Sequence, residues 1–178
     1  MSVQLKKTEP DINHTCCFTG LRPQKMTFGF DESNELCKRI KYQLEQEIIR
    51  MITEQQVTRF ISGMALGVDQ WAAEAVLSLQ EQFPQITLEC ALPCETQAEK
   101  WTVEQRERYF SILERCSKET ILQKHYTRDC MQKRNCYMVN KSHYVIAVWD
   151  GSQGSTSNTV RFARHIGKEV RMIDPMKL

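Results

Sequence analysis

The sequence lacks a large excess of charge of either sign. It carries 24 Lys and Arg residues against 22 Asp and Glu residues, which gives a formal net charge of +2 and a sequence pI near 8.1. A dedicated nucleic-acid-binding domain usually has a pI above about 9. The balanced charge therefore counts against a surface built mainly for nucleic acid, although a local basic patch is still compatible with it.

Two kinds of targeting segment are also missing from the sequence. No apolar run approaches the ~18 residues of a membrane-spanning helix, and the first residues show no secretory signal pattern. We therefore expect a cytoplasmic protein with no membrane partner.

The cysteines lack the spacings of a metal site, because no CxxC pair and no Cys/His zinc pattern occurs. Most of them fall inside apolar runs, where a free cysteine behaves as a small hydrophobic residue. We expect reduced thiols in the core and no metal centre. The eight cysteines are Cys16, Cys17, Cys37, Cys90, Cys94, Cys116, Cys130 and Cys136.

The 178 residues are enough for one domain that buries roughly 70% of its unfolded surface. Residues 1–12 are polar and show no periodicity, so we expect a flexible N-terminal tail. Residues 13–178 are expected to form a single domain.

Apolar periodicity divides this domain into alternating strands and helices. Ser33, Thr127 and the Thr96–Glu99 pair have the character and spacing of helix N-terminal caps. The predicted strands are 14–19, 57–61, 86–92, 119–122, 143–149 and 168–173, and the predicted helices are 33–52, 68–83, 96–116, 128–141 and 160–166.

This alternation indicates an α/β fold of three layers, with helices on both faces of an open, mostly parallel sheet. The run 143–149 is apolar throughout, so it is predicted to be a central parallel strand. Ligands of such sheets bind outside the carboxyl ends of the strands.

Three glycine-bearing loops follow predicted strands and should meet at that edge of the sheet. Glycine permits positive φ angles and close backbone approach, and a helix that begins after such a loop offers free N–H groups to an anion. One such loop is equally well explained as a simple turn, but three at one edge predict a phosphate-bearing ligand. The loops span residues 20–23, 62–69 and 151–156.

Four side chains near these loops have both a functional and a structural interpretation. Arg22 could clamp a phosphate or form a surface ion pair, and Asp69 could act as a base or stabilise the first turn of its helix. Trp101 could stack on a base or pack in the core. Asn135 lies on an otherwise apolar helix face and needs a partner, for which a backbone carbonyl is simpler than a ligand.

Three motifs together resemble the SLOG superfamily, which joins the DprA/Smf DNA-processing proteins with the LOG (lonely guy) phosphoribohydrolases. The best resemblance is to its YpsA-like branch, over roughly residues 14–173. The motifs are Thr19-Gly20-Leu21-Arg22-Pro23, Ser62-Gly63-Met64-Ala65-Leu66-Gly67-Val68-Asp69 with Ala72-Ala73-Glu74, and Ile146-Ala147-Val148-Trp149-Asp150-Gly151 with Gly154-Ser155-Thr156. Pro93, Gln97, Trp101, Arg134-Asn135 and Asn158 also look like that branch.

The resemblance implies a Rossmann-like fold with a nucleotide-type pocket at the strand ends, and by analogy a homodimer. LOG enzymes carry a Pro-Gly-Gly-x-Gly-Thr-x-x-Glu segment whose Glu serves in glycosidic cleavage. If Thr156 matches the threonine of that segment, Thr159 stands where the Glu would be. Threonine cannot supply the carboxylate that this chemistry requires.

We therefore expect a non-enzymatic binding or sensor protein for a nucleotide or an ADP-ribose-like ligand. The alternatives are a nucleotide hydrolase, for which Asp69 is the available base, and a single-stranded-DNA-binding protein of the DprA kind. The latter function would require a positively charged groove, to which four cations could contribute: Arg22, Arg128, Lys133 and Arg134. The residues expected to contact the ligand are Gly20, Arg22, Pro23, Ser62, Gly63, Met64, Gly67, Asp69, Gln70, Pro93, Gln97, Trp101, Asn135, Asp150, Gly151, Gly154, Ser155, Thr156 and Asn158.

Overall fold

The computed structural model describes residues 11–178, so residues 1–10 of the predicted tail lie outside the described residues. Ile12 already begins the first turn of the domain. In chain order the elements are η1 (Ile12–His14), β1 (Thr15–Gly20), η2 (Pro23–Lys25), α1 (Glu35–Gln55), β2 (Arg59–Ser62), α2 (Val68–Leu79), β3 (Thr87–Leu92), α3 (Val103–Arg115), β4 (Lys118–Ile121), α4 (Cys130–Asn140), β5 (Tyr144–Val148), α5 (Ser155–His165), β6 (Glu169–Ile173) and η3 (Pro175–Lys177). The three η elements are short 3₁₀ turns.

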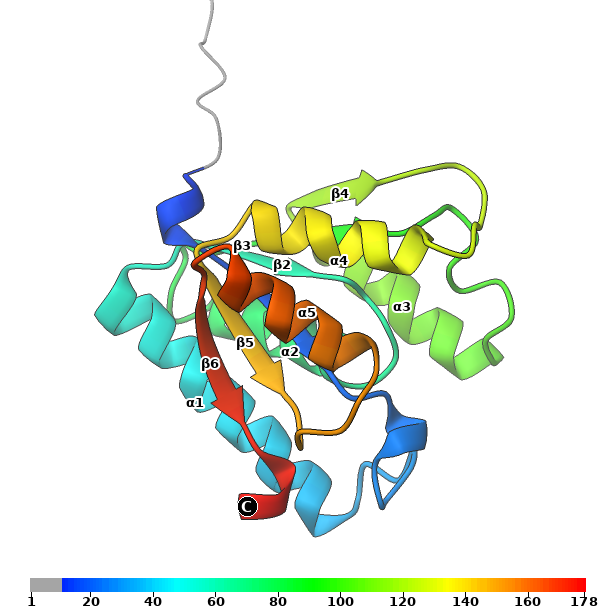
Figure 1. Ribbon diagram of the computed structural model, residues 1–178, viewed down its shortest axis with the longest axis horizontal. Helices are drawn as coiled ribbons and strands as arrows, with labels where there is room; N and C mark the ends of the chain where they lie inside the picture. The colour runs from blue at the N-terminus through cyan, green and yellow to red at the C-terminus, as the bar shows by residue number, and fades with distance from the viewer. Residues whose placement is uncertain (1–10) are drawn as a thin grey trace, which may run out of the picture.

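Six parallel strands form one open sheet in the order β4-β3-β2-β1-β5-β6. Helices α4 and α5 cover one face, and α1, α2 and α3 cover the other (Figure 1). The predicted three-layer, Rossmann-like α/β fold is confirmed, and the sheet is parallel throughout. β5 lies between β1 and β6, so the strongest apolar run of the sequence is an interior strand as predicted.

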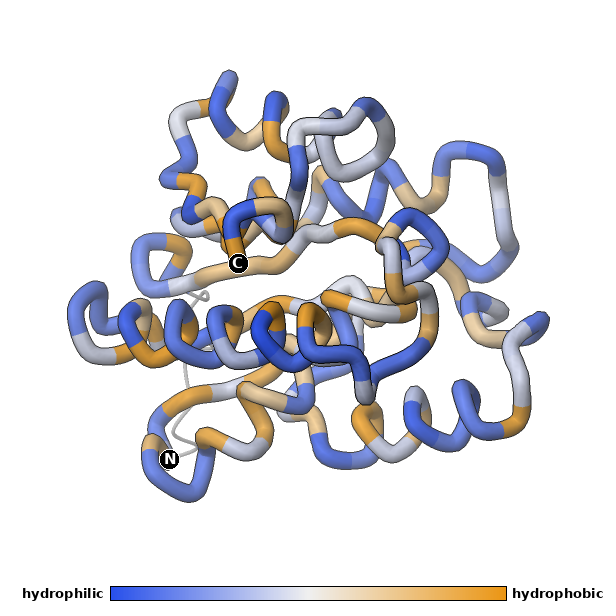
Figure 2. Tube along the Cα trace, turned by 90° about the horizontal axis from the view of Figure 1, so that it is seen from below, coloured by the Kyte–Doolittle hydropathy of each residue, from blue (hydrophilic) through white to orange (hydrophobic). Residues whose placement is uncertain are grey.

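Two apolar clusters hold the helices to the sheet. The larger lies on the side of α1, α2 and α3 and contains Phe18 and Phe60, whose stacked rings have centroids 5.9 Å apart. The smaller lies beneath α4 and α5 and contains Met138 and Ala163. Apolar and polar residues alternate along the helical turns, as the colouring in Figure 2 shows. Burial on both faces explains why β1 and β5 are continuous apolar runs.

Helices α1 and α4 begin later than predicted because their N-terminal caps differ. Asn34, rather than Ser33, caps α1, since its side chain accepts a hydrogen bond from the Leu36 amide at 2.9 Å. Thr127 does not cap α4; its hydroxyl donates to Asp129 Oδ1 at 2.8 Å, and the helix starts after Asp129.

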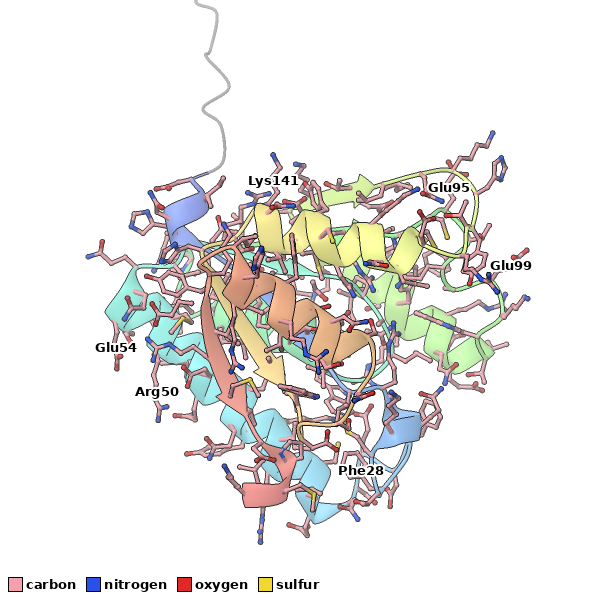
Figure 3. The ribbon with its side chains drawn as sticks, in the orientation of Figure 1. Phe28, Arg50, Glu54, Glu95, Glu99 and Lys141 are labelled. Carbon is pink, nitrogen blue, oxygen red and sulfur yellow. The ribbon has the colours of Figure 1, made fainter. Side chains whose placement is uncertain are left out.

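The predicted capping box at Thr96 and Glu99 is wrong. Residues 95–101 form turns, the Thr96 hydroxyl lies 3.7 Å from the Cys94 sulfur, and the Glu99 side chain lies at the periphery of the molecule (Figure 3). The box that forms is six residues further on. There Thr102 Oγ1 accepts from the Gln105 amide at 3.2 Å, and Gln105 Oε1 accepts from the Thr102 amide at 3.1 Å. Thr102 therefore sets the start of α3.

The end of α2 and the start of α5 also differ from the prediction. α2 ends at Leu79, before the predicted stop at Phe83, and the Gln80 side chain donates to the Ile86 carbonyl at 3.1 Å as the chain turns toward β3. α5 starts at Ser155, directly after Gly154, so the third glycine loop runs straight into a helix N-terminus.

A charged network joins the segment before α1 to α2 and α3. Glu32 accepts hydrogen bonds from Trp71 Nε1 at 3.0 Å, from Arg108 and from Lys41, and Arg108 also donates to Glu74 at 2.6 and 2.7 Å. Burial alone would raise the pKa of Glu32, but the bonds from Arg108, Lys41 and Trp71 outweigh it and lower the pKa to about 2.

This network predicts a specific loss of stability in acid. The pKa of Glu32 is lower in the folded protein than its ordinary value of 4.5, so its contribution is present above that value and is lost as the pH falls toward about 2. Glu32→Gln should flatten the fall of the urea unfolding midpoint over this range. Glu54→Gln, at an exposed position on α1, should leave the wild-type profile unchanged. Identical acid profiles for both variants and the wild type would refute the assignment.

Of the helices between residues 11 and 178, none combines the length and the apolar character that crossing a membrane requires.

Candidate anion site at the carboxyl edge of the sheet

Three neighbouring strands, β2, β1 and β5, bring the three glycine loops to one edge of the sheet. The strands are parallel and paired in register, so their carboxyl ends point the same way. The loop after β2 leads into α2, the loop after β1 into η2, and the loop after β5 into α5. The chain therefore assembles, from distant parts of the sequence, the edge at which ligands of parallel sheets bind.

Arg134 is the most unusual side chain at this edge. It comes from α4, is only 1% exposed, and donates from Nη1 to the Gly63 carbonyl and from Nε to Asn135 Oδ1 at 2.8 Å. A Cβ atom on Gly63 would lie 2.6–2.8 Å from the Arg134 guanidinium. Gly63 is predicted to contact a phosphate through its backbone, and its missing side chain also makes room for Arg134.

The Arg134 guanidinium is a buried cation without a carboxylate ion pair among residues 11–178. Burial lowers its pKa to about 10, attraction from Asp69 opposes that shift, and repulsion from Arg22 adds to it. The group therefore stays protonated at neutral pH while lacking a partner of opposite charge at contact distance.

The loop between β2 and α2 is held by its own side chains. Ser62 Oγ donates to the Asp69 carbonyl at 2.7 Å and accepts from the Met64 amide at 3.2 Å, and Asp69 Oδ2 accepts from the Ala65 amide at 3.2 Å. Gln70 Nε2 donates to the Met64 carbonyl at 3.3 Å. These bonds keep Met64 at a φ of 58°, an uncommon value for a residue with a side chain. Asp69 thus has the structural role of fixing the loop.

Asn135 links α4 to the start of α5. Its Nδ2 donates to Ser155 Oγ at 3.3 Å and to Thr159 Oγ1 at 3.2 Å. The expected backbone-carbonyl partner is wrong, because hydroxyl groups of the neighbouring helix satisfy the amide. The Gly154 amide donates to Ser157 Oγ at 2.9 Å, while the amides of Ser155 and Thr156 begin the helix and have no intrahelical acceptor.

A small cavity and a larger groove meet at Asn135 and Ser155. The cavity, of about 20 Å³, is lined by Phe18, Thr19, Gly20, Arg22, Asp69, Arg134, Asn135 and Ser155. The groove between α4 and α5, of about 390 Å³, is lined by Arg128, Met131, Gln132, Asn135, Cys136, Gly154, Ser155, Asn158, Thr159 and Phe162. We call the cavity the anion cavity and the groove the α4–α5 groove.

Three of the predicted contact residues line neither the anion cavity nor the α4–α5 groove. Pro23, Gly67 and Gln70 line a separate cavity of about 270 Å³ next to Trp71 and Arg108. Gly67 has a φ of 89°, and a Cβ there would come within 2.9 Å of Pro23 Cδ, so this glycine serves the turn and its packing.

Gly20 has a packing role as well as a place at the anion cavity. A Cβ on Gly20 would lie 2.6 Å from the side chain of Val68. The glycine therefore lets the end of β1 approach the first turn of α2.

Several predicted contact residues pack near the site without lining its cavity or groove. Gln97 Nε2 donates to the Gly63 carbonyl at 3.0 Å, and Tyr109 donates to Gln97 Oε1 at 3.3 Å. Trp101 packs edge-on against Tyr109, with ring centroids 5.4 Å apart, so it has the packing role. Pro93, Gln97 and Trp101 line neither the anion cavity nor the α4–α5 groove.

Asp150 and Gly151 are exposed in the third loop. Asp150 Oδ1 accepts a hydrogen bond from the Ser152 amide at 2.9 Å. Hydrogen bonds from the Ser152 side chain and from this amide lower the pKa of the Asp150 carboxyl. Its role is to shape the loop before α5.

Lys25 is a site residue that the motifs did not single out. It stands at the end of η2, its Nζ donates to the Gln153 carbonyl at 3.4 Å, and a Cβ on Gly154 would lie 2.6 Å from that Nζ. A cation three residues after Arg22 on the same loop was the available signal. Within residues 11–178 no group of three or more His, Cys, Asp or Glu side chains could hold a metal ion.

The model of the YspA SLOG family (YpsA) matches residues 16–178, nearly the whole chain. This chain belongs to the YpsA family. The YpsA-family chain is similar to the SPbeta prophage-derived protein YoqJ of Bacillus subtilis, with 30% identity over 80% of the chain and 91% of YoqJ. It is also 32% identical to a UPF0398 protein of Halalkalibacterium halodurans, over 78% of the chain and 77% of that relative.

A solved structure has the same fold. DNA processing protein A (DprA) of Streptococcus pneumoniae matches with a TM-score of 0.59 at 14% identity, over 89% of this chain and 49% of DprA. The YpsA-family chain therefore spans about half the length of DprA, and the likeness shows the shared Rossmann-like fold.

Proposed function

We propose that this chain is a binding or sensor protein for a nucleotide-derived small molecule, such as an ADP-ribose-like ligand, held by its phosphate at the anion cavity. The observation that supports this most is Arg134, a buried cation with no carboxylate within ion-pair distance among residues 11–178. Burying a charge without a partner destabilises the folded protein by roughly several kcal/mol. A bound anion supplies the missing counter-charge.

The other groups at the cavity also favour an anion. Arg22 is partly exposed and makes no ion pair with any described residue. The free amides of Ser155 and Thr156 stand at the positive end of the α5 dipole, and Lys25 adds a cation at the Gly154 backbone. Planar guanidinium groups bind phosphate through paired, charge-assisted hydrogen bonds. Phosphate is the anion that best matches this set of donors.

The dimensions favour a phosphate at the mouth of the cavity rather than inside it. An interior of about 20 Å³ has room for roughly one water molecule, so the phosphate would sit where the cavity opens over Ser155. The rest of the ligand would lie in the α4–α5 groove, whose volume of about 390 Å³ is typical of small-molecule sites. Met131 and Phe162 give that groove apolar walls, while Gln132 and Asn158 offer amide groups to a base.

The geometry supports binding better than hydrolysis or DNA binding. Thr159 is buried, donates to the Ser155 carbonyl at 3.0 Å and brings no carboxylate to the groove. Asp69, the available base for hydrolysis, already accepts a hydrogen bond at Oδ2 from the Ala65 amide of its own loop. Trp101 packs edge-on against Tyr109 and lines neither the anion cavity nor the α4–α5 groove.

Arg22→Gln should weaken binding of a phosphate-bearing ligand about tenfold, because it removes one set of charge-assisted hydrogen bonds. Calorimetric titration of the full chain with inorganic phosphate, AMP, ADP, ADP-ribose and NAD would measure the change. Arg39→Gln, which removes an exposed arginine of α1, is the matched control and should bind as the wild type does. Equal weakening by both substitutions would mean only a general charge effect.

The same panel separates the alternatives. No binding to any probe at about 1 mM would count against the proposal. A shift of a single-stranded oligonucleotide that fades steeply with added salt would assign DNA binding instead. Release of free base from AMP would assign a hydrolase.

A further inference from the structure

The cavity of about 270 Å³ that Trp71 lines takes no part in the proposed nucleotide binding. Its wall comes from the segment between β1 and α1, from the loop before α2 and the first turn of that helix, and from the start of α3. It shares no lining residue with the anion cavity or the α4–α5 groove. Sites for drug-sized ligands measure roughly 300–1,000 Å³, so this smaller space suits a molecule with a single ring. We call it the Trp71 cavity.

Apolar side chains form part of the wall of the Trp71 cavity. The Trp71 ring is 4% exposed, and Leu66 and Pro23 line the cavity beside it. Phe30 also lines the cavity but is 53% exposed, which leaves much of its ring in water. A ligand that packs against Phe30 removes apolar surface from water, and this removal favours binding.

The charged groups of the wall compensate one another, with one exception. Arg108 donates to both Glu32 and Glu74, and Lys41 donates to Glu32, so two carboxylates and two cations are paired. Glu104 lines the same cavity from the first turn of α3 and is exposed. It makes no ion pair with any of the described residues. The cavity therefore has one uncompensated negative charge beside its apolar wall.

Gln70 adds a buried hydrogen-bond acceptor to the Trp71 cavity. Its side chain lines the cavity and is 1% exposed. The amide Nε2 donates to the Met64 carbonyl at 3.3 Å, while Oε1 accepts no hydrogen bond from a donor in residues 11–178. Buried polar groups are normally hydrogen-bonded. A ligand with an N–H group would satisfy this oxygen.

We propose that the Trp71 cavity binds a small organic cation in which an amidinium, guanidinium or ammonium group is attached to one apolar ring. Glu104 supplies the counter-charge, and Gln70 Oε1 offers an acceptor for an N–H group. Phe30 and Leu66 pack against the ring of the ligand, and an aromatic face also attracts a cation. Binding here is independent of the phosphate bound at the anion cavity, because the two sites share no residue and select opposite charges.

Benzamidine and benzamide distinguish a cation site from a merely apolar one. The two probes have nearly the same shape, but only benzamidine is charged at neutral pH. Titration of the isotopically labelled full chain should give saturable amide shifts at Phe30, Leu66 and Gly67 with a Kd for benzamidine on the order of 1 mM. Benzamide should bind about fivefold more weakly or worse. Equal affinity for the two probes, or no saturable shift with benzamidine at about 20 mM, would overturn the proposal.

Glu104→Gln should weaken benzamidine binding about fivefold and remove the preference over benzamide. Glu107→Gln is the matched control, because Glu107 is an exposed glutamate of the same helix that does not line the cavity. It should bind as the wild type does. Wild-type affinity in Glu104→Gln, or equal weakening in both variants, would show that Glu104 is not the counter-charge.

Phe30→Ala tests the apolar wall separately from the charge. It should weaken benzamidine and benzamide alike by about fivefold, since it removes the ring surface that either probe covers. Tyr42→Ala removes an aromatic ring of similar exposure on α1, away from the cavity lining, and should leave both affinities unchanged. Unchanged binding in Phe30→Ala would contradict the proposed place of the ring.

Discussion

Arg134→Met is expected to weaken binding of the best phosphate-bearing probe by about 100-fold or more, which corresponds to about 2.7 kcal/mol. The substitution keeps an unbranched apolar side chain of similar length but removes the buried cation that faces the anion cavity. It also removes the hydrogen bonds to the Gly63 carbonyl and to Asn135. Titration of the full chain with the probe identified from the nucleotide panel measures the effect.

Two further variants on α4 show whether the loss at Arg134 is specific. Lys133→Met removes the neighbouring exposed cation and should change the affinity by less than about twofold. Arg134→Lys keeps the charge but not the planar donor set, so it should bind with intermediate affinity. Wild-type affinity in Arg134→Met, with the variant folded, would show that Arg134 does not serve the ligand.

Glu89→Gln is expected to destabilise the fold by about 3 kcal/mol. Glu89 is 2% exposed in β3 and accepts from Arg59 Nε at 3.1 Å, Thr120 Oγ1 at 2.8 Å and Tyr137 Oη at 2.7 Å. Neutralising it leaves the Arg59 guanidinium, only 13% exposed, without its counter-charge. Urea unfolding at neutral pH gives the difference in free energy.

Glu119→Gln is the matched control for Glu89. This residue lies on the neighbouring strand β4, is exposed and makes no ion pair among the described residues. Its substitution should change the free energy of unfolding by less than about 0.5 kcal/mol. Equal losses in the two variants would show that the buried cluster of Glu89 does not carry the stability assigned to it.

The alternation of strands and helices was readable from sequence because burial on both faces of the sheet makes the apolar runs continuous. Helix starts were less certain, since Thr96–Glu99 and Thr102–Gln105 both have capping-box spacing. The choice between them depends on how residues 95–101 pack beneath Gly63, where Gln97 donates to its carbonyl. That contact joins residues 34 positions apart, which no local pattern reveals.

The place of the candidate site was predictable because parallel strands bring the loops that follow them to one edge of the sheet. The structural roles of the individual residues at the site were not predictable. Glycine can signal a positive φ, a ligand or a close neighbour, and only the folded structure distinguishes these. Gly63 makes room for Arg134, and Gly20 makes room for Val68. The place of Lys25 at the site was not predictable, because its contact with Gly154 joins residues 129 positions apart and no sequence spacing reveals it.

The central claim is that a phosphate-bearing nucleotide binds where β1, β2 and β5 end. Amide chemical shifts of the isotopically labelled full chain, followed during titration with the tightest-binding nucleotide of the panel, test it most directly. We predict saturable shifts at Gly20, Gly63, Gly154, Ser155 and Thr156, with little change along β4 and β6. The absence of shifts at about 10 mM nucleotide, or shifts confined to residues away from these loops, would contradict it.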